Sequence, residues 1–167
     1  FDLSRIRNRN KPEGRNMQDV TAASGLNYVH RENHFVEFDR EPLIPHMVST
    51  EGPAAAVADI NGDGLDDIFL GGARNQQASV FVQHPNGRFA LMPQPALLAD
   101  SVYEDVDAWW ADVNNDKYPD LLVASGGNEF YGKDFHNTPR LYLGSASGLL
   151  TRKTDAFDSL YLTASTI

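Results

Sequence analysis

One stretch of the chain decides the fold, because it occurs twice. It reads Pro53-Ala-Ala-Ala-Val-Ala-Asp-Ile-Asn-Gly-Asp-Gly-Leu-Asp-Asp-Ile-Phe-Leu-Gly-Gly72 in its first copy and Val106-Asp-Ala-Trp-Trp-Ala-Asp-Val-Asn-Asn-Asp-Lys-Tyr-Pro-Asp-Leu-Leu-Val-Ala-Ser-Gly-Gly127 in its second. Asp59 and Asp112 are 53 residues apart, and in each copy a polar loop leads into an apolar run that ends in a Gly-Gly pair. Internal repetition of this length is typical of proteins built from repeated supersecondary units.

Each copy predicts four short antiparallel strands. The runs that flank the loops are short, apolar and bounded by turn residues, as β-strands are. Two further strand-like runs follow in each copy, separated by turn-forming residues. The expected strands are Ala54–Ala58, Ile68–Leu70, Ser79–Gln83 and Phe89–Met92 in the first copy, and Asp107–Ala111, Leu121–Ala124, Arg140–Leu143 and Leu149–Arg152 in the second. The sequence shows no helical period, apart from one helical turn expected within Pro95–Val102.

Four strands in about fifty residues indicate a propeller blade, so we expect an all-β fold with β-propeller-type blades of four antiparallel strands. Closed propellers have about four to eight blades, which predicts that this chain is a fragment of a larger propeller. The expected segments are a basic flexible arm at 1–16, an N-terminal segment packing on the blades at 17–49, the first blade at 50–105, the second blade at 106–157, and the start of a truncated third repeat at 158–167.

The loop of each copy carries oxygen-bearing side chains at alternating positions, which predicts a calcium site. Calcium takes about six to eight oxygen ligands in a flexible geometry. Without a cation, the three carboxylates of each loop would repel one another. The expected ligands are Asp59, Asn61, Asp63, Leu65 (through its backbone carbonyl) and Asp67 in the first loop, and Asp112, Asn114, Asp116, Tyr118 (through its backbone carbonyl) and Asp120 in the second.

The second loop departs from this pattern at two positions. Lys117 stands where the first loop has Gly64, and Pro119 stands where it has Asp66. The tight curl of the loop needs a left-handed backbone at the first of these positions, which costs a residue with a side chain about 1 kcal/mol. The ammonium group of Lys117 would also repel a nearby cation. We therefore expect the second loop to bind calcium more weakly than the first.

An EF-hand is excluded by the same spacing. Its loop has a glutamate at the twelfth position and a helix on each side. The twelfth positions here are Leu70 and Val123, and the flanking runs are strand-like.

Composition narrows the classes of function further. The chain has 167 residues, no cysteine and a net charge of −9. The absence of cysteine excludes disulfides, thiolate catalysis and cysteine-based zinc sites. The acidic charge disfavours nucleic acid as a partner, and no apolar run is long enough for a membrane span. Residues 1–15 alone are basic, with five basic and two acidic residues, and they indicate a solvated arm.

The stretch from Ala58 to Gly72 resembles the FG-GAP/VCBS repeat, which is similar to the calcium-bearing blades of integrin α-subunit propellers. The stretches Asp19–Gly25, Phe38–Pro45 and Val123–Phe130 resemble bacterial secreted proteins of the cartilage-acidic-protein-like branch. This resemblance implies an extracytoplasmic propeller with Ca²⁺ bound in the loop between the first two strands of a blade. It implies no single shared activity, because some members are adhesive and many have no assigned function.

We therefore expect a calcium-binding extracellular repeat module that serves adhesion or holds a glycan or protein ligand. Its expected location is extracellular, periplasmic or at the cell surface, with a signal sequence outside this stretch, and exposed blade faces would allow it to form oligomers. The alternative is part of a secreted carbohydrate-active enzyme, with acids such as Glu104 or Asp105 at a cleft and calcium as a structural ion. Trp109 and Trp110 are expected to pack between blades, and the alternative role for them is a sugar-stacking platform.

Overall fold

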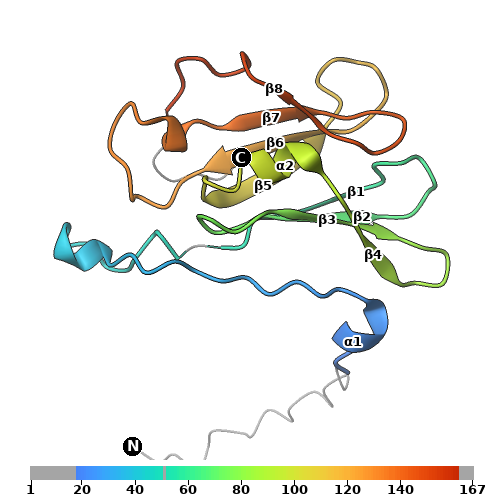
Figure 1. Cartoon of the computed structure of the whole chain (residues 1–167), viewed down its shortest axis with the longest axis horizontal. Helices are drawn as coiled ribbons and strands as arrows, with labels where there is room; N and C mark the ends of the chain where they lie inside the picture. Colours follow the sequence, from blue (N-terminus) through green and yellow to red (C-terminus); the bar gives the residue numbers. More distant parts are fainter. Residues whose placement is uncertain (1–17, 51, 162–167) are drawn as a thin grey trace, which may run out of the picture.

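The computed structural model of the chain describes residues 18–50 and 52–161. Within them lie two four-stranded antiparallel sheets, each with its strands in sequence order (Figure 1). The first blade consists of β1 (Ala55–Ala58), β2 (Asp67–Leu70), β3 (Ser79–Gln83) and β4 (Phe89–Met92), and the second blade of β5 (Asp105–Ala111), β6 (Asp120–Ser125), β7 (Arg140–Leu143) and β8 (Thr151–Lys153). This architecture confirms the expected all-β fold of propeller-type blades.

The strand positions agree closely with those expected from the sequence. β3, β4 and β7 have the expected bounds, while β1, β2 and β6 differ by a single residue at one or both ends. β8 begins two residues later than expected, and β5 begins two residues earlier, with an irregularity between Asp105 and Asp107. The sequence pattern did not indicate the start of β5, because its first residue, Asp105, is a buried carboxylate instead of an apolar side chain.

The hydrophobic core lies between the two blades. The facing rows of cross-strand partners are Ala56, Phe69 and Val80 on the first blade, and Trp110, Leu121 and Tyr142 on the second. Because successive side chains of a strand point to opposite faces of the sheet, the neighbours of these residues lie on the outer faces. Trp110 therefore packs between the blades as expected, whereas Trp109 is 59% exposed on the outer face of the second blade.

Helices are short and connect or precede the blades. α2 (Pro95–Ala99) links β4 to β5 and buries Leu97, in agreement with the single helical turn expected there. α1 (Thr21–Ser24) was not expected, because four residues are too few to show a helical period. Two 3₁₀ helices, η2 (Glu37–Asp39) and η3 (Phe135–Asn137), lie in the connecting segments. Within the described ranges, none of the helices has the length and apolarity that a membrane span requires.

The N-terminal segment, residues 18–50, is mostly extended and runs along the side of the first blade (Figure 1). The hydroxyl group of Tyr28 donates to the carbonyl of Gly71 at 2.5 Å. The side chain of Gln76 bonds the backbone of the segment twice, accepting from Arg31 at 2.8 Å and donating to Val29 at 2.8 Å. The expected domain bounds stay predictions, and the expected arm at 1–16 lies outside the described residues, as does most of the expected third repeat.

Candidate functional site

The two acidic loops project from the same end of the two blades. Residues 59–66 connect β1 to β2, and residues 112–119 connect β5 to β6. Both loops lie on the right in Figure 1, whereas the Gly-Gly segments that follow β2 and β6 lie at the opposite ends of those strands. The repeat therefore places two chemically similar loops at the same end of the two blades.

In the first loop, Asp59 organises the backbone. Its Oδ1 accepts the N–H groups of Gly62 at 2.7 Å and Asp63 at 3.1 Å, and its Oδ2 accepts that of Gly64 at 2.8 Å. Burial acts to raise the pKa of the Asp59 carboxyl, but these donated hydrogen bonds outweigh it and lower the pKa. Asn61 makes a similar short turn by accepting the N–H of Asp63 at 2.9 Å. The side chains of Asp59 and Asn61 thus hold the backbone of the loop in its curled conformation through hydrogen bonds.

The second loop repeats most of this network, and Asn114 Nδ2 adds a hydrogen bond to Asp116 Oδ2 at 2.9 Å. Asp112 accepts the N–H groups of Asp116 at 3.1 Å and Lys117 at 2.9 Å, and Asn114 accepts that of Asp116 at 3.0 Å. Asp116 in turn accepts the N–H of Tyr118 at 2.9 Å, as Asp63 does with Leu65. The substitutions that distinguish the second loop therefore leave its backbone conformation unchanged.

The equivalence extends to the two left-handed residues of each loop. In the first loop Gly62 has a φ of 77° and Gly64 a φ of 83°, and in the second Asn115 has 61° and Lys117 has 78°. Asparagine tolerates this conformation better than most residues, whereas lysine does not. The left-handed conformation expected of Lys117 is confirmed, and the second loop contains a local strain that the first avoids.

Asp67 and Asp120 have a structural role that sequence reasoning missed. Each is 1% exposed and accepts two backbone N–H groups. Asp67 bonds Ile60 at 3.1 Å and Gln83 at 2.8 Å, while Asp120 makes the equivalent bonds to Val113 at 2.9 Å and to Gly144 at 2.8 Å. These carboxylates tether the start of the loop to the end of the third strand of the blade.

The donor set of the loops fits calcium in its chemistry, because carboxylate, amide and backbone carbonyl oxygens are the ligands calcium prefers. Within residues 18–50 and 52–161, however, no three His, Asp or Glu side chains lie close enough together to form a metal cluster. The structure therefore shows the curled backbone of each loop and its hydrogen bonds to Asp67 or Asp120. The convergence of the loop carboxylates on one calcium ion stays a prediction.

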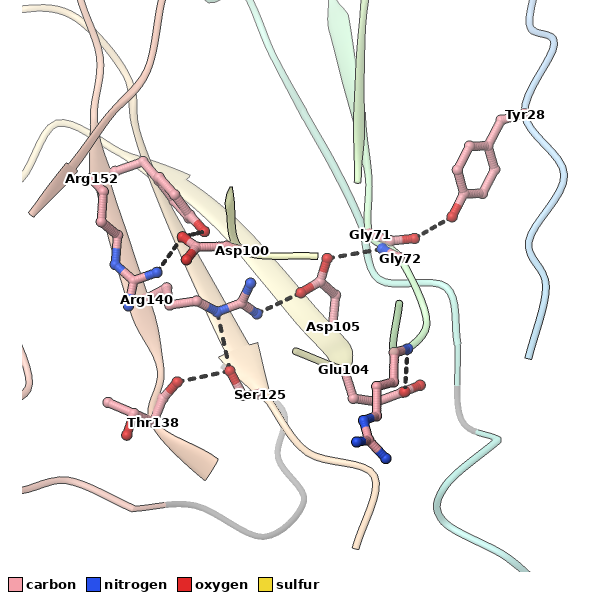
Figure 2. Close-up of polar contacts among 12 residues, drawn as sticks. Tyr28, Gly71, Gly72, Asp100, Glu104, Asp105, Ser125, Thr138, Arg140 and Arg152 are labelled. Atoms are coloured by element: carbon pink, nitrogen blue, oxygen red, sulfur yellow. Dashed lines mark hydrogen bonds and ion pairs between the residues drawn. The ribbon is translucent and has the colours of Figure 1, made fainter. Parts of the chain in front are cut away.

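A buried polar seam joins the blades at the end opposite the loops (Figure 2). Asp105, at the start of β5, accepts the N–H of Gly72 from the first blade at 2.8 Å and a hydrogen bond from Arg140 Nη2 at 2.5 Å. Arg140 also donates from Nε to the Ser125 hydroxyl at 3.2 Å. Burial alone would lower the pKa of Arg140, but the charge of Asp105 and its hydrogen bond raise it above its usual range. Asp105 thus connects the two blades directly.

Glu104 lies beside this pair and is 6% exposed. Its Oε2 accepts the N–H of Arg74 at 2.8 Å, while its Oε1 has no hydrogen-bond partner in the part of the chain that the structure describes. Burial, together with the charges of Glu32, Asp105 and Glu129, raises the pKa of Glu104 to about 8. At neutral pH this carboxyl is therefore mostly protonated.

Glu104 and Asp105, the candidate catalytic acids of the carbohydrate-active enzyme alternative, are both occupied by structural contacts. Asp105 is committed to Arg140 and Gly72, and Glu104 is packed beneath the backbone of Arg74. Both are buried in the seam, so neither is presented as a cleft carboxylate. The signal for this seam in the sequence was the lone arginine that opens the otherwise apolar run Arg140–Leu143.

Fold and loops together define a class, namely a protein with propeller-type blades whose first two strands are joined by an acidic loop. Residues 59–123, which span both loops, match the family described as FG-GAP-like repeat. The chain is also 29% identical over 135 residues to integrin alpha-IIb of Mus musculus, an alignment that covers 71% of this chain and 13% of the integrin. The chain thus carries an FG-GAP-like repeat. It spans only a small part of the curated relative it matches, and the assignment to the cartilage-acidic-protein-like branch stays a prediction.

Proposed function

We propose that this chain is a calcium-binding repeat module in which the ions hold the two loops in shape and the blades present a surface for adhesion or ligand binding. The observation that carries the proposal is the close similarity of the two loops in hydrogen bonding and backbone conformation. Two sequences that differ at several positions share most of their loop hydrogen bonds and have left-handed residues at the same two positions. A shared ligand explains why acidic residues are retained at the same positions of both loops.

The location and partners follow from the same proposal. The match to an FG-GAP-like repeat and to an integrin supports a role outside the cytoplasm, at the cell surface or in the extracellular space. Calcium sites of extracellular modules have dissociation constants of about 10⁻⁴–10⁻³ M. The partner would be an extracellular protein or a glycan. The buried positions of Glu104 and Asp105 favour binding over carbohydrate cleavage.

The test is calorimetric titration of metal-free protein with calcium, combined with thermal unfolding. Calcium that binds only the folded state stabilises it by about 1.4 kcal/mol at ten times the dissociation constant. Asp63→Ala removes one expected ligand of the first loop and should abolish the heat that belongs to this loop. Asp66→Ala is the matched control, because Asp66 is an exposed carboxylate in the same loop but outside the ligand pattern.

A second variant distinguishes calcium binding at the second loop from calcium binding at the first. Asp116→Ala should remove the weaker of two binding events and leave the stronger one in place. Absence of both heat and thermal shift at millimolar calcium would contradict the proposal, as would equal losses in Asp63→Ala and Asp66→Ala.

A further inference from the structure

The turn between β3 and β4 contains an asparagine that is followed by a glycine. Asn86 and Gly87 form this pair, and the chain has one more such pair, Asn61 and Gly62. Asparagine is a thermolabile residue, because the backbone nitrogen of the next residue can attack its side-chain amide. A following glycine hinders this attack least, since it has no side chain. The two pairs are therefore the candidate sites of a spontaneous modification.

Asn86 lies in an exposed turn with room for its backbone to move. All residues from His84 to Arg88 are exposed, so water and hydroxide reach the side-chain amide of Asn86 from solvent. Gly87 has a φ of 76°. Apart from its neighbours in the chain, no heavy atom of the described residues lies within 4 Å of the place that a Cβ atom on Gly87 would take. The Gly87 nitrogen can therefore approach Asn86 without a clash.

The hydrogen bonds of the turn prepare Asn86 for this attack. The backbone N–H of Arg88 donates to Asn86 Oδ1 at 3.0 Å, which holds the side chain against the peptide unit that follows it. The same bond stabilises the negative charge that Oδ1 gains when a nucleophile adds to Cγ. The N–H of Gly87 donates to the carbonyl of His84 at 2.8 Å. A neutral acceptor thus holds the proton that must leave.

The other pair, Asn61 and Gly62, has the same kind of turn but a stronger restraint on the attacking nitrogen. Asn61 Oδ1 accepts the N–H of Asp63 at 2.9 Å. The N–H of Gly62, however, donates to the carboxylate of Asp59 at 2.7 Å. Charge-assisted hydrogen bonds of this kind are about twice as strong as neutral ones. The fold therefore holds the proton of Gly62 more firmly than that of Gly87.

The neighbouring charges favour Asn86 as well. Attack requires a backbone nitrogen that has lost its proton and is negatively charged. Arg88 places a positive charge two residues after Asn86, whereas Asp59 and Asp63 place negative charges two residues before and after Asn61. Nearby positive charge stabilises the anionic nitrogen, and nearby negative charge destabilises it.

We propose that the folded chain is modified by deamidation at Asn86, in preference to Asn61, and that the main product is isoaspartate. Hydroxide removes the proton of the Gly87 nitrogen, which then forms a bond to Asn86 Cγ. The Cγ–Nδ2 bond breaks, and ammonia leaves with a proton from water, which regenerates the hydroxide. Water then opens the succinimide ring at the main-chain carbonyl of Asn86, so that the chain continues through Cγ and the former carbonyl becomes a carboxylate.

The product differs from the natural turn in charge and in length. Isoaspartate lengthens the main chain by a carbon atom and displaces the oxygen that accepts the N–H of Arg88. This change occurs where the N–H of His84 pairs with the carbonyl of Arg88 at 2.8 Å. The next residue, Phe89, is the one whose backbone lies in close contact with Gly25 of the N-terminal segment. The modification therefore acts beside the contact between this segment and the first blade.

The test follows both asparagines in the folded chain in a metal-free, mildly alkaline buffer made with water enriched in heavy oxygen. Deamidation in this buffer incorporates heavy oxygen, which distinguishes it from deamidation during later digestion. Mass spectrometry should show that Asn86 deamidates several-fold faster than Asn61. An isoaspartyl methyltransferase should then methylate the peptide that contains position 86. Equal rates, a faster reaction at Asn61, or a deamidated peptide that the methyltransferase does not label would overturn the proposal.

The same measurement in urea separates the fold from the local sequence. Unfolding breaks the hydrogen bond between Gly62 and Asp59, so the two rates should approach each other. A ratio of rates that unfolding leaves unchanged would overturn the proposal, because local sequence alone would then set the preference. Deamidation of Asn86 in urea but not in the folded chain would overturn it as well.

Two charge variants test the role of Arg88. Arg88→Glu replaces the positive neighbour of Asn86 by a negative one and should slow its deamidation several-fold. Lys133→Glu is the matched control, because it makes the same change of charge at an exposed position in the connection between β6 and β7. It should leave the rate at Asn86 unchanged. Equal rates in the two variants would contradict the electrostatic part of the proposal. Since none of these measurements involves calcium, they stand or fall separately from calcium binding by the acidic loops.

Discussion

Replacing Glu104 by glutamine should make the folded state markedly less sensitive to alkaline pH. Glu104 is 6% exposed, its Oε1 lacks a partner within the described residues, and burial is the main cause that raises its pKa from 4.5 to about 8. Glutamine keeps the size of the side chain and an oxygen that can accept the N–H of Arg74, but it cannot ionise.

The direction of the pH dependence of the free energy of unfolding follows from proton binding. Between pH 4.5 and about 8 the folded state holds the proton of Glu104 while the unfolded state has lost it, so the free energy of unfolding falls as pH rises. Each pH unit in this window removes up to about 1.36 kcal/mol, and the whole window removes on the order of 3–5 kcal/mol. Below pH 4.5 the group contributes no dependence, and above pH 8 the full penalty is present.

Urea unfolding at a series of pH values between 4 and 9 measures the effect. The difference in unfolding free energy between Glu104→Gln and the natural chain should be small at pH 4.5 and should grow in favour of the variant up to about pH 8. Asp39→Asn, which neutralises an exposed carboxylate of the N-terminal segment, is the control and should show no such growth. A constant difference across the pH range would refute the reasoning, because it would show that Glu104 ionises alike in both states.

Five further substitutions test the backbone strain of the loops, the buried ion pair and the packing between the blades. Lys117→Gly should stabilise the metal-free chain by about 1 kcal/mol and Gly64→Lys should destabilise it by about as much, since both positions are left-handed; urea unfolding without calcium checks both, and equal signs would contradict the strain. Asp105→Asn should cost about 3–5 kcal/mol, because it leaves a buried guanidinium without its counter-charge, which a fall in the thermal midpoint measures. Trp110→Ala should lower the free energy of unfolding by about 3–5 kcal/mol and Trp109→Ala by less than about 1 kcal/mol, because Trp110 is 8% exposed and Trp109 is 59% exposed. Scanning calorimetry of both variants measures the difference.

The candidate loops illustrate how much local sequence can predict. The spacing of Asp59, Asn61 and Asp63 indicated a tight curl, and the structure contains it, because each of these side chains bonds backbone groups only two to five residues away. The left-handed Lys117 was predictable for the same reason, since the requirement comes from the loop itself. Whether the carboxylates converge on an ion depends on the ion as well as on the chain, so spacing alone predicts it without demonstrating it.

The polar seam shows where sequence reasoning fails. Glu104 and Asp105 read as an acidic cluster before a strand, and their partners Arg74 and Arg140 are 30 and 35 residues away along the chain. No local pattern connects residues at such separations. The buried position of these acids, and with it the raised pKa of Glu104, arises only when the second blade packs on the first.

The sequence by itself determined the unit of this protein: four strands, an acidic loop after the first of them, and a repeat. It could do so because strand alternation, turn residues and loop hydrogen bonds act over a few residues. Only the tertiary structure decided which side of each blade is covered. Trp109 and Trp110 are adjacent and chemically identical, yet one is exposed and the other buried, because the two faces of a sheet differ only in what packs against them.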